Sequence, residues 1–569
     1  MPRASAAIAA FAAYAAAAVL ATWPLAADPD ASLLFSARRF DGYGVLWFGE
    51  HAWRVVTRGE PLWTSDTVAW PRGLDLRLAD SFLFGLLYLP FRAVFSPVVA
   101  FNVFCLAAMV ATAMGGWALG RALGGGPIAA TACGFLLGFN SLMHDYRLEG
   151  EAYLLFGAPL PLFAAALART MRGGGPGAGA LAGALFGVLA WSSGYYAIDA
   201  AIVGAVLGAG LLVAGARPSP KALAAFVGVA LLTAGPMATL VLGARPEDVL
   251  AARFPAGEDP LANVAKDAVS LTGMLVPLPG SAPFRAERTT YLGMAALALA
   301  GGACVVRGWR TTLPWALVAV AGAALALGPV LKVSDADVAG AAMPYTWLAR
   351  ATSAVLAYRM PVRFFAVAYV GLGALAALCL EGLAREGLAA WRRLALVGVV
   401  AVDGLLFSGA AVDRTAAPAQ VPSGYAKLSG EGAVLDLFGH DRLLLRYAGR
   451  SVFYQVAHGQ PTLANFTRAG DLQGEAGRRL AVALANGDLD AARSIAGVLA
   501  DAGVTDLALH PASFPDSDVA SIRAGLDAIA VAVPAEPPAA PEDDPVELWR
   551  LPAATGPREA AIATLEGWG

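Results

Sequence analysis

Residues 6–25 read AAIAAFAAYAAAAVLATWPL, and the stretch FDGYG follows at residues 40–44. The first stretch carries no charged side chain over about 20 residues, the length that crosses roughly 30 Å of hydrocarbon. Arg3 precedes it, which predicts a membrane helix with its amino terminus in the cytoplasm. Residues 25–27 resemble a small-residue cleavage site, but the apolar stretch is longer than the core of a signal peptide, which favours a retained helix.

The rest of the chain has the composition of a membrane protein. Of its 569 residues, 58% are hydrophobic and only 15% are charged, whereas soluble domains carry about a quarter charged residues. The net charge of -3 provides no basic field for a phosphate backbone, which argues against a nucleic-acid partner. The four cysteines lie in apolar stretches and have no metal-ligand spacing.

About eleven apolar runs of roughly 17 to 25 residues follow one another up to residue 411. After the first, they cover residues 98–119, 128–139, 153–168, 178–193, 197–213, 222–242, 291–306, 313–330, 364–380 and 394–411. With the amino terminus inside, the basic residues between these runs collect on the cytoplasmic side, as membrane proteins require. Counting residues 82–95 as a further span would destroy this sorting, so we expect an interfacial or re-entrant helix there.

The predicted fold class is therefore an α-helical polytopic membrane protein with a C-terminal soluble α/β domain. Residues 1–411 form the transmembrane domain with an outer-face loop at 28–97, and residues 412–569 form the extracytoplasmic domain. In the second domain, short apolar runs at 433–438 and 451–456 precede an Ala-rich helical stretch at 475–502. Strand-like runs follow at 505–509 and 546–551, and this order predicts a small α/β unit.

Charged residues gather first in the outer-face loop. Asp41 opens a helical pattern that continues through Trp47, Glu50 and His51, and the tryptophans of this loop suit a membrane interface. Asp41 is either a functional acid or a residue that caps the free amides of the helix. Glu50 and His51 point to different faces, and each is either a solvated surface residue or a substrate ligand.

Two further charged clusters lie on the predicted outer side. One is the short connection that holds His144, Asp145, Arg147, Glu149 and Glu151, which is either a hydrated loop with weak ion pairs or a site for substrate. The other is the pair Arg359 and Arg363 around Pro361. Arginines on the outer side require an anionic partner, and phosphate or pyrophosphate fits a guanidinium group better than a general lipid headgroup does.

The order of a first helix, an outer loop opening with an acid, interfacial helices and a helix ending in a cytoplasmic arginine resembles the GT-C superfamily of membrane glycosyltransferases. Short motifs extend the likeness to a bacterial GT-C-like multispanning group. These motifs are Trp70-Pro71-Arg72-Gly73, Tyr291-Leu292-Gly293, Leu327-Gly328-Pro329, Arg359 to Phe364, Tyr454-Gln455 and His458-Gly459.

The resemblance implies transfer of a sugar from a polyprenyl-phosphate donor to an acceptor, at the extracytoplasmic face of a bacterial inner membrane. It implies that Asp41 is the catalytic base or holds the acceptor or a divalent metal, and that Arg359 or Arg363 binds the donor phosphate. Asp145, Arg147, Glu149, Glu50 and His51 are the further candidates for substrate binding. The sequence departs from many GT-C enzymes where Gly42, and not a second acid, follows Asp41.

Two other functions stay open at this point. A transporter or flippase of a lipid-linked saccharide would need ionisable residues within its spans, and Asp199 is the main example here. A non-catalytic protein of envelope polysaccharide assembly would need only a binding surface outside the membrane.

Overall fold

A computed structural model describes residues 3–23, 25–36, 39, 41–77, 81–242, 259–276, 291–334, 336–337, 343–352, 355–356, 358–407, 416–439, 444–464, 472–534 and 545–568. The chain forms two compact units. The helical unit consists of Met1–Ser36 and Ala79–Ala416, and the mixed unit consists of Ala37–Leu78 and Ala417–Gly569. The division differs from the predicted boundaries because the larger part of the outer-face loop groups with the C-terminal residues.

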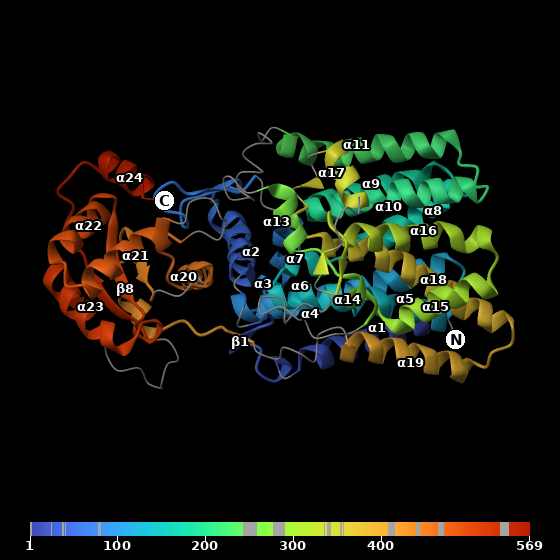
Figure 1. The fold of residues 1–569 in the computed structure, drawn as a ribbon, viewed down its shortest axis with the longest axis horizontal. Coiled ribbons are helices and arrows are strands. Elements are labelled where there is room, and N and C mark those ends of the chain that lie inside the picture. Colours follow the sequence, from blue (N-terminus) through green and yellow to red (C-terminus); the bar gives the residue numbers. More distant parts are fainter. Residues whose placement is uncertain are drawn as a thin grey trace. The chain divides into compact units, whose positions relative to one another are not determined.

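The helical unit is made almost entirely of helices joined by short turns (Figure 1). Its helices are α1 (Arg3–Thr22), α3 (Phe82–Arg92), α4 (Pro97–Ala122), α5 (Pro127–Gly138), α6 (Ser141–Glu149), α7 (Ala152–Leu155), α8 (Pro159–Met171), α9 (Pro176–Ser192), α10 (Gly194–Val213), α11 (Pro220–Leu242), α13 (Pro260–Lys266), α14 (Leu271–Leu275), α15 (Met294–Val306), α16 (Trp309–Ala326), α17 (Pro344–Ala351), α18 (Phe365–Arg385) and α19 (Ala390–Phe407). Strands β1 (Ser32–Leu33), β4 (Lys332–Val333) and β5 (Ala336–Asp337) are short.

Six helices in the described ranges are long and apolar enough to cross a membrane. They are α1, α4, the continuous segment Ala152–Met171, α10, α11 and the segment Pro361–Arg385 that contains α18. Helix α3, at 11 residues, is the short apolar helix predicted at 82–95. Within the described residues, each predicted span overlaps one or two helices of this unit, which agrees with the predicted class of a helical membrane protein. The number of about eleven crossings stays a prediction.

Helix α1 packs into the helical unit through Tyr14. The Tyr14 side chain is fully buried, and its hydroxyl donates a hydrogen bond to the carbonyl oxygen of Thr131 in α5 at 2.9 Å. Its ring lies edge-on to Phe135 with 5.0 Å between the ring centroids. The first apolar stretch is therefore a structural helix of this unit.

Helix α18 lies at the centre of the helical unit and is almost wholly buried. It meets α16 through two glycines. A Cβ atom on Gly322 would lie 2.3 Å from the backbone nitrogen of Ala368, and one on Gly371 would lie 2.4 Å from that of Ala319. Small residues allow such close backbone approach, on which helix association in lipid depends.

We expect Gly322→Ala to destabilise the helical unit by about 1 to 3 kcal/mol, because the added methyl group meets backbone atoms that cannot rotate away. Gly228→Ala in α11 is the matched control, since nothing lies within 4 Å of its added Cβ. Thermal unfolding in detergent measures both. Equal melting temperatures for the two variants would contradict the close contact between α16 and α18.

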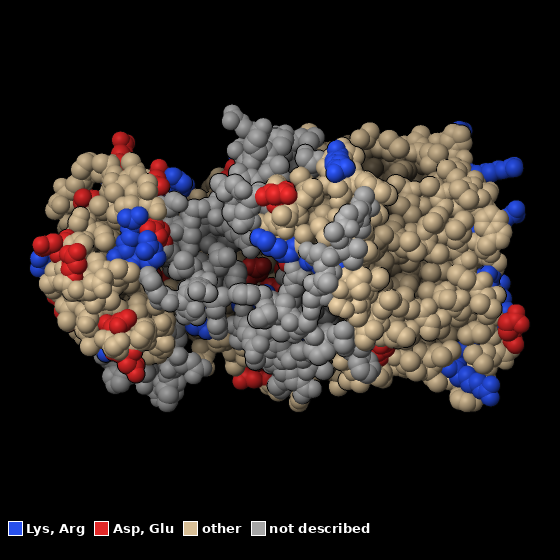
Figure 2. All heavy atoms as spheres, in the orientation of Figure 1, with Lys and Arg blue, Asp and Glu red and all other residues tan. Residues whose placement is uncertain are grey.

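Basic residues collect at one end of the helical bundle. The turns between α10 and α11, α15 and α16, and α18 and α19 lie at this end (Figure 1), and Figure 2 shows Lys and Arg gathered there while the flanks of the bundle are nearly free of charge. The residues on these turns are Arg217, Lys221, Arg307, Arg310, Arg385, Arg392 and Arg393. The fold thus places the basic residues as the positive-inside rule expects of the cytoplasmic end.

The mixed unit is built on a four-stranded sheet in the order β7-β8-β10-β9. Strands β7 (Ala433–Leu437) and β8 (Val504–Leu509) are parallel, and β10 (Glu547–Arg550) pairs antiparallel with β8 and with β9 (Val531–Val533). The remaining elements are α2 (Asp41–Arg58), β2 (Thr64–Ser65), β3 (Leu74–Asp75), β6 (Ala417–Pro418), α20 (Leu444–His458), α21 (Leu472–Ala485), α22 (Leu489–Asp501), α23 (Asp516–Ile529) and α24 (Arg558–Glu566). Helices and sheet share a core that includes Leu435, Leu480, Leu499, Leu507 and Trp549.

The strands predicted at 505–509 and 546–551 are confirmed as β8 and β10, and the short apolar run at 433–438 forms β7. The apolar run at 451–456 belongs instead to helix α20, because a short apolar run does not distinguish a strand from a buried helix. The helical stretch at 475–502 splits into α21 and α22. Gly487 takes a positive φ of 71° at the break, and the Asp488 side chain caps α22 by accepting from the amide of Ala491 at 3.0 Å.

Helix α2 completes the mixed unit by packing on α20. The indole nitrogen of Trp47 donates to Oε1 of Gln455 at 2.9 Å, and the Tyr43 ring lies 5.2 Å from that of Phe453. Trp47 is fully buried. The interpretation of Trp47 as a membrane-interface residue is therefore wrong, because its ring is used inside a protein core.

We expect a fragment of residues 417–569 to be less stable than the same fragment joined through a flexible linker to residues 37–78. The shorter fragment exposes the α20 face that Trp47 covers, and loss of one buried aromatic contact costs at least about 2 kcal/mol. Urea unfolding of the two soluble fragments measures the difference. Equal unfolding midpoints would show that α2 adds nothing to the unit.

Candidate functional site

The predicted outer connection at 141–151 is a buried helix and not a hydrated loop. Helix α6 begins after Asn140, whose side chain accepts from the amide of Met143 at 3.0 Å, and it ends at Gly150 with a φ of 78°. Every residue from 141 to 151 is buried, including Asp145, Arg147 and Glu149. The hydrated-loop interpretation is wrong because the segment is helical and each of its residues is buried.

One ionisable side chain of α6, that of His144, is held in its neutral form. Burial and the neighbouring Arg147 cation lower the pKa of His144 to about 3. A group with this pKa carries no charge near neutral pH, so His144 adds a polar but uncharged ring to the interior. It therefore supplies no cation for a phosphate.

Glu151 forms a buried ion pair with Arg363. Arg363 lies in the 3₁₀ turn Pro361–Phe364 that leads into α18, and its side chain is only 4% exposed. Its guanidinium group also lies over the ring of Tyr195, 4.1 Å from the centroid. A carboxylate and an aromatic face both contact this cation, and its burial makes it less accessible to a phosphate than an exposed arginine would be.

A second buried polar pair lies in the same part of the helical unit. Asp199 in α10 is fully buried, and its Oδ1 accepts a hydrogen bond from the Tyr358 hydroxyl at 2.8 Å. Burial and the Asp199 carboxylate raise the pKa of Tyr358 well above its ordinary value, so the hydroxyl remains a donor. Asp199 stood out in the sequence as a charge within a span, whereas nothing in the local pattern marked Tyr358.

Arg359 differs from Arg363 in its surroundings. It is half-buried, and it lies between the buried residues Tyr358 and Met360. Of the two arginines predicted to bind an anion, Arg359 is thus the more accessible. The structure brings both into the helical unit together with Asp145, Arg147 and Glu149.

The remaining predicted site residues belong to the mixed unit. Asp41 is the first residue of α2 and is exposed, whereas Glu50 and His51 are buried. Burial and nearby Arg54 lower the pKa of His51, which favours a neutral imidazole. The interpretation of Glu50 and His51 as solvated surface residues is wrong, because α2 is covered along most of its length. The pairing of Asp41 with the arginines of the helical unit stays a prediction.

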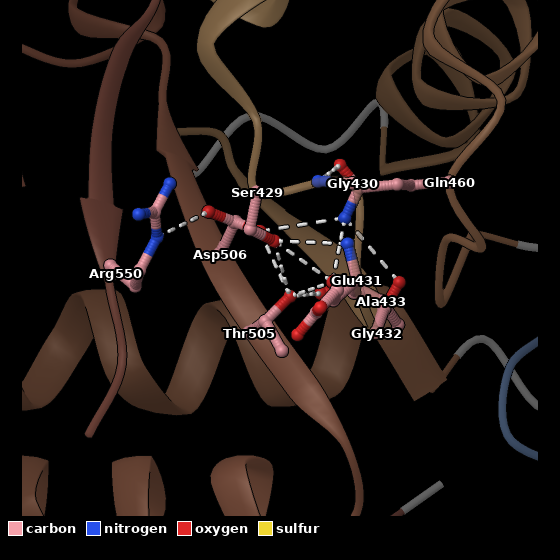
Figure 3. A network of polar contacts seen from close by, with 9 residues as sticks. All are labelled: Ser429, Gly430, Glu431, Gly432, Ala433, Gln460, Thr505, Asp506 and Arg550. Carbon is pink, nitrogen blue, oxygen red and sulfur yellow. Dashed lines mark hydrogen bonds and ion pairs between the residues drawn. The ribbon is translucent and has the colours of Figure 1, made fainter. Parts of the chain in front are cut away.

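Figure 3 shows a polar network around Asp506, which lies in strand β8. The buried Asp506 carboxylate accepts from the hydroxyls of Ser429 at 2.5 Å and Thr505 at 2.8 Å, and it lies 3.6 Å from Nε of Arg550. The backbone amide of Gly430, in the same loop as Ser429, donates a hydrogen bond to Oε1 of Gln460 at 3.1 Å. These contacts tie the loop before β7 to β8, and the network therefore has a structural role.

Another buried cluster in the mixed unit joins Asp436, Tyr425 and His510. The Tyr425 hydroxyl donates to Oδ1 of Asp436 at 2.5 Å and lies 3.0 Å from Nε2 of His510. Although burial opposes ionisation, hydrogen bonds from His510 and its neighbours lower the pKa of Asp436. Among the residues that the structure describes, no three His, Cys, Asp or Glu side chains come together as a metal site.

No protein-family model and no curated protein matches the sequence. Solved structures do match the fold. The arabinofuranosyltransferase AftD from Mycobacteria aligns with a TM-score of 0.54 and 15% identity, over 96% of this chain and 42% of that one. The oligosaccharyltransferase of Archaeoglobus fulgidus aligns with a TM-score of 0.52 and 12% identity, over 89% and 69%.

The two neighbours are, by name, an arabinofuranosyltransferase and an oligosaccharyltransferase. The chain therefore shares its overall fold with these two proteins, which supports the predicted resemblance at the level of fold. It spans less than half the length of the mycobacterial protein.

Proposed function

We propose that this protein is a membrane glycosyltransferase that uses a sugar linked to a polyprenyl phosphate. The observation that supports the proposal most strongly is the fold, which is shared over nearly the whole chain with two glycosyltransferases. Because a fold alone does not define an activity, the proposal also relies on two accessible side chains of the appropriate chemistry. These are the carboxylate of Asp41 and the guanidinium group of Arg359.

In the proposed reaction, an acceptor hydroxyl attacks the anomeric carbon of the donor sugar. The new bond forms as the bond from that carbon to the phosphate oxygen breaks, and the hydroxyl proton passes to Asp41 as general base. The polyprenyl phosphate leaves with the electron pair, and Arg359 stabilises its negative charge. A single displacement of this kind inverts the anomeric centre.

The proposal is tested with the full-length protein in vesicles that contain a radiolabelled polyprenyl-phosphate sugar and a bacterial envelope extract as acceptor. We expect label to move from the lipid into the extract only when the protein is present. Passage of the intact lipid-linked sugar to the other leaflet without transfer would support a transporter instead. Binding of envelope polysaccharide without transfer would support an assembly protein.

We also propose that the chain lies in a bacterial inner membrane with the mixed unit outside the cytoplasm. Lys and Arg collect at one end of the helical bundle, and α19 begins at this end with Arg392 and Arg393 in its first turn. The chain that follows α19 therefore leaves the helical unit from the opposite end, which supports this orientation. A reporter that is active only in the periplasm, fused after Gly569, is expected to be active. Activity of a cytoplasm-only reporter at the same position would reverse the orientation.

A further inference from the structure

The segment that carries Arg359 is fixed to the helical unit by a fully buried tyrosine. The hydroxyl of Tyr345 in α17 is hydrogen-bonded to the carbonyl oxygens of Val355 and Tyr358, at 2.9 and 3.1 Å. Both carbonyl oxygens belong to the backbone just before Arg359. The main chain at this point is therefore held by the interior of the protein.

Tyr358 provides a second attachment through its side chain. Its ring stacks on Phe364 with 3.9 Å between the centroids and an interplanar angle of 6°. Its edge contact with Tyr195 has a centroid distance of 4.9 Å, and its hydroxyl donates to Asp199 at 2.8 Å. Since Tyr358 directly precedes Arg359, this attachment limits where the Arg359 side chain begins.

Arg363 anchors the other end of the same segment. Its ion pair with Glu151 and its contact with the Tyr195 ring are buried, so these interactions fix the start of the turn into α18. The partly accessible Arg359 thus lies between two attached residues, Tyr358 and Arg363. Both of these residues contact the ring of Tyr195. Only Arg359 of this set keeps some exposure.

We infer that Tyr358 and Asp199 position Arg359 to contact the phosphate of the lipid donor, while Arg363 anchors the segment and does not touch the phosphate. The inference rests on the proposed function, whose donor it describes further. Tyr358 and Asp199 are positioning residues, because they act on the phosphate only through Arg359. An arginine held in place binds a phosphate better than one that must first be ordered.

The size of the expected effect follows from the cost of ordering a backbone. If the backbone of one residue must be ordered when the ligand binds, the affinity for the ligand falls by roughly a factor of 5 to 30. Tyr358→Phe keeps the ring and its stacking but removes the hydrogen bond to Asp199. We therefore expect this variant to bind the phosphate about tenfold more weakly. Its melting temperature is expected to fall as well, because the buried Asp199 side chain loses its hydrogen-bond partner.

The test measures binding of undecaprenyl phosphate to the full-length protein in phosphatidylcholine nanodiscs. Arg359→Gln is expected to weaken binding by about 10- to 100-fold, and Arg359→Lys is expected to recover part of the loss. The informative measurement is the double variant Tyr358→Phe with Arg359→Gln. If Tyr358 acts through Arg359, its loss adds nothing once Arg359 is gone, which a double-mutant cycle detects.

Arg350→Gln is the matched control, because Arg350 is an exposed arginine at the end of α17; it is expected to bind the probe as the unmodified protein does. If Tyr358→Phe does not fold, Tyr345→Phe loosens the same segment and replaces it in the cycle. Equal losses from Tyr358→Phe with and without Arg359 would overturn the inference, and so would unchanged binding by Arg359→Gln. No binding by the unmodified protein would instead reject the proposed donor.

Discussion

Asp41→Asn is expected to lower sugar transfer by about two to four orders of magnitude, because the amide keeps the size of the side chain but cannot accept the acceptor proton. Asp41 is exposed at the start of α2, so the substitution disturbs no packed contact of the core. The measurement is transfer from a polyprenyl-phosphate sugar in vesicles. The melting temperature of the variant is expected to match that of the unmodified protein.

Two comparisons separate a catalytic base from a structural role for Asp41. If Asp41 serves only the helix terminus, Asn substitutes without loss, whereas Asp41→Ala costs about 1 kcal/mol of stability. Asp516→Asn is the matched control, since Asp516 is likewise an exposed aspartate that opens a helix, α23. Undiminished transfer by Asp41→Asn would remove Asp41 from the mechanism and direct attention to Asp145 and Glu149.

Glu151→Gln is expected to destabilise the helical unit by about 3 to 5 kcal/mol, because it leaves the Arg363 charge buried without its counterion. The side chains of this pair are only 7% and 4% exposed, so water cannot replace the lost carboxylate. Thermal unfolding in detergent measures the effect. The double variant Glu151→Gln with Arg363→Met is expected to recover much of the loss, because an apolar side chain needs no partner there.

Glu475→Gln is the control for removal of an ion pair at the surface. Glu475 pairs with Arg478 and Arg479 on α21, where both arginine side chains are 42% exposed. Solvent-exposed pairs of this kind contribute at most about 1 kcal/mol. A Glu151→Gln variant as stable as Glu475→Gln would show that the Arg363 charge is satisfied by another group.

The membrane class and the positions of the long apolar helices could be predicted from the sequence because they depend on local properties. Length and the scarcity of charge identify α1, α4, α10 and α11 without reference to any other segment. The strands β7, β8 and β10 were likewise found from short apolar runs next to turn residues. The break at Gly487 was missed, because an Ala-rich stretch on both sides of it continues the helical pattern.

The candidate site could be predicted only in part. Asp41, Arg359 and Arg363 stood out because charged residues beside apolar spans are costly and rare. The sequence could not distinguish Arg359 from Arg363, since both are arginines near the same proline. Tyr358 and Tyr345 were missed, because a tyrosine in an apolar segment gives no local sign that its hydroxyl holds a loop.

By itself, the sequence determined that the chain is a multi-pass helical protein with a smaller α/β part, because hydrophobic length and periodicity are properties of neighbouring residues. Only the tertiary structure decided which charges are available to a ligand. Glu151 and Arg363 are 212 positions apart, and residues 37–78 join a unit whose other residues begin at 417. Such pairings depend on how helices pack in space, and burial then determines whether a charge must be neutralised inside the protein or stays exposed at its surface.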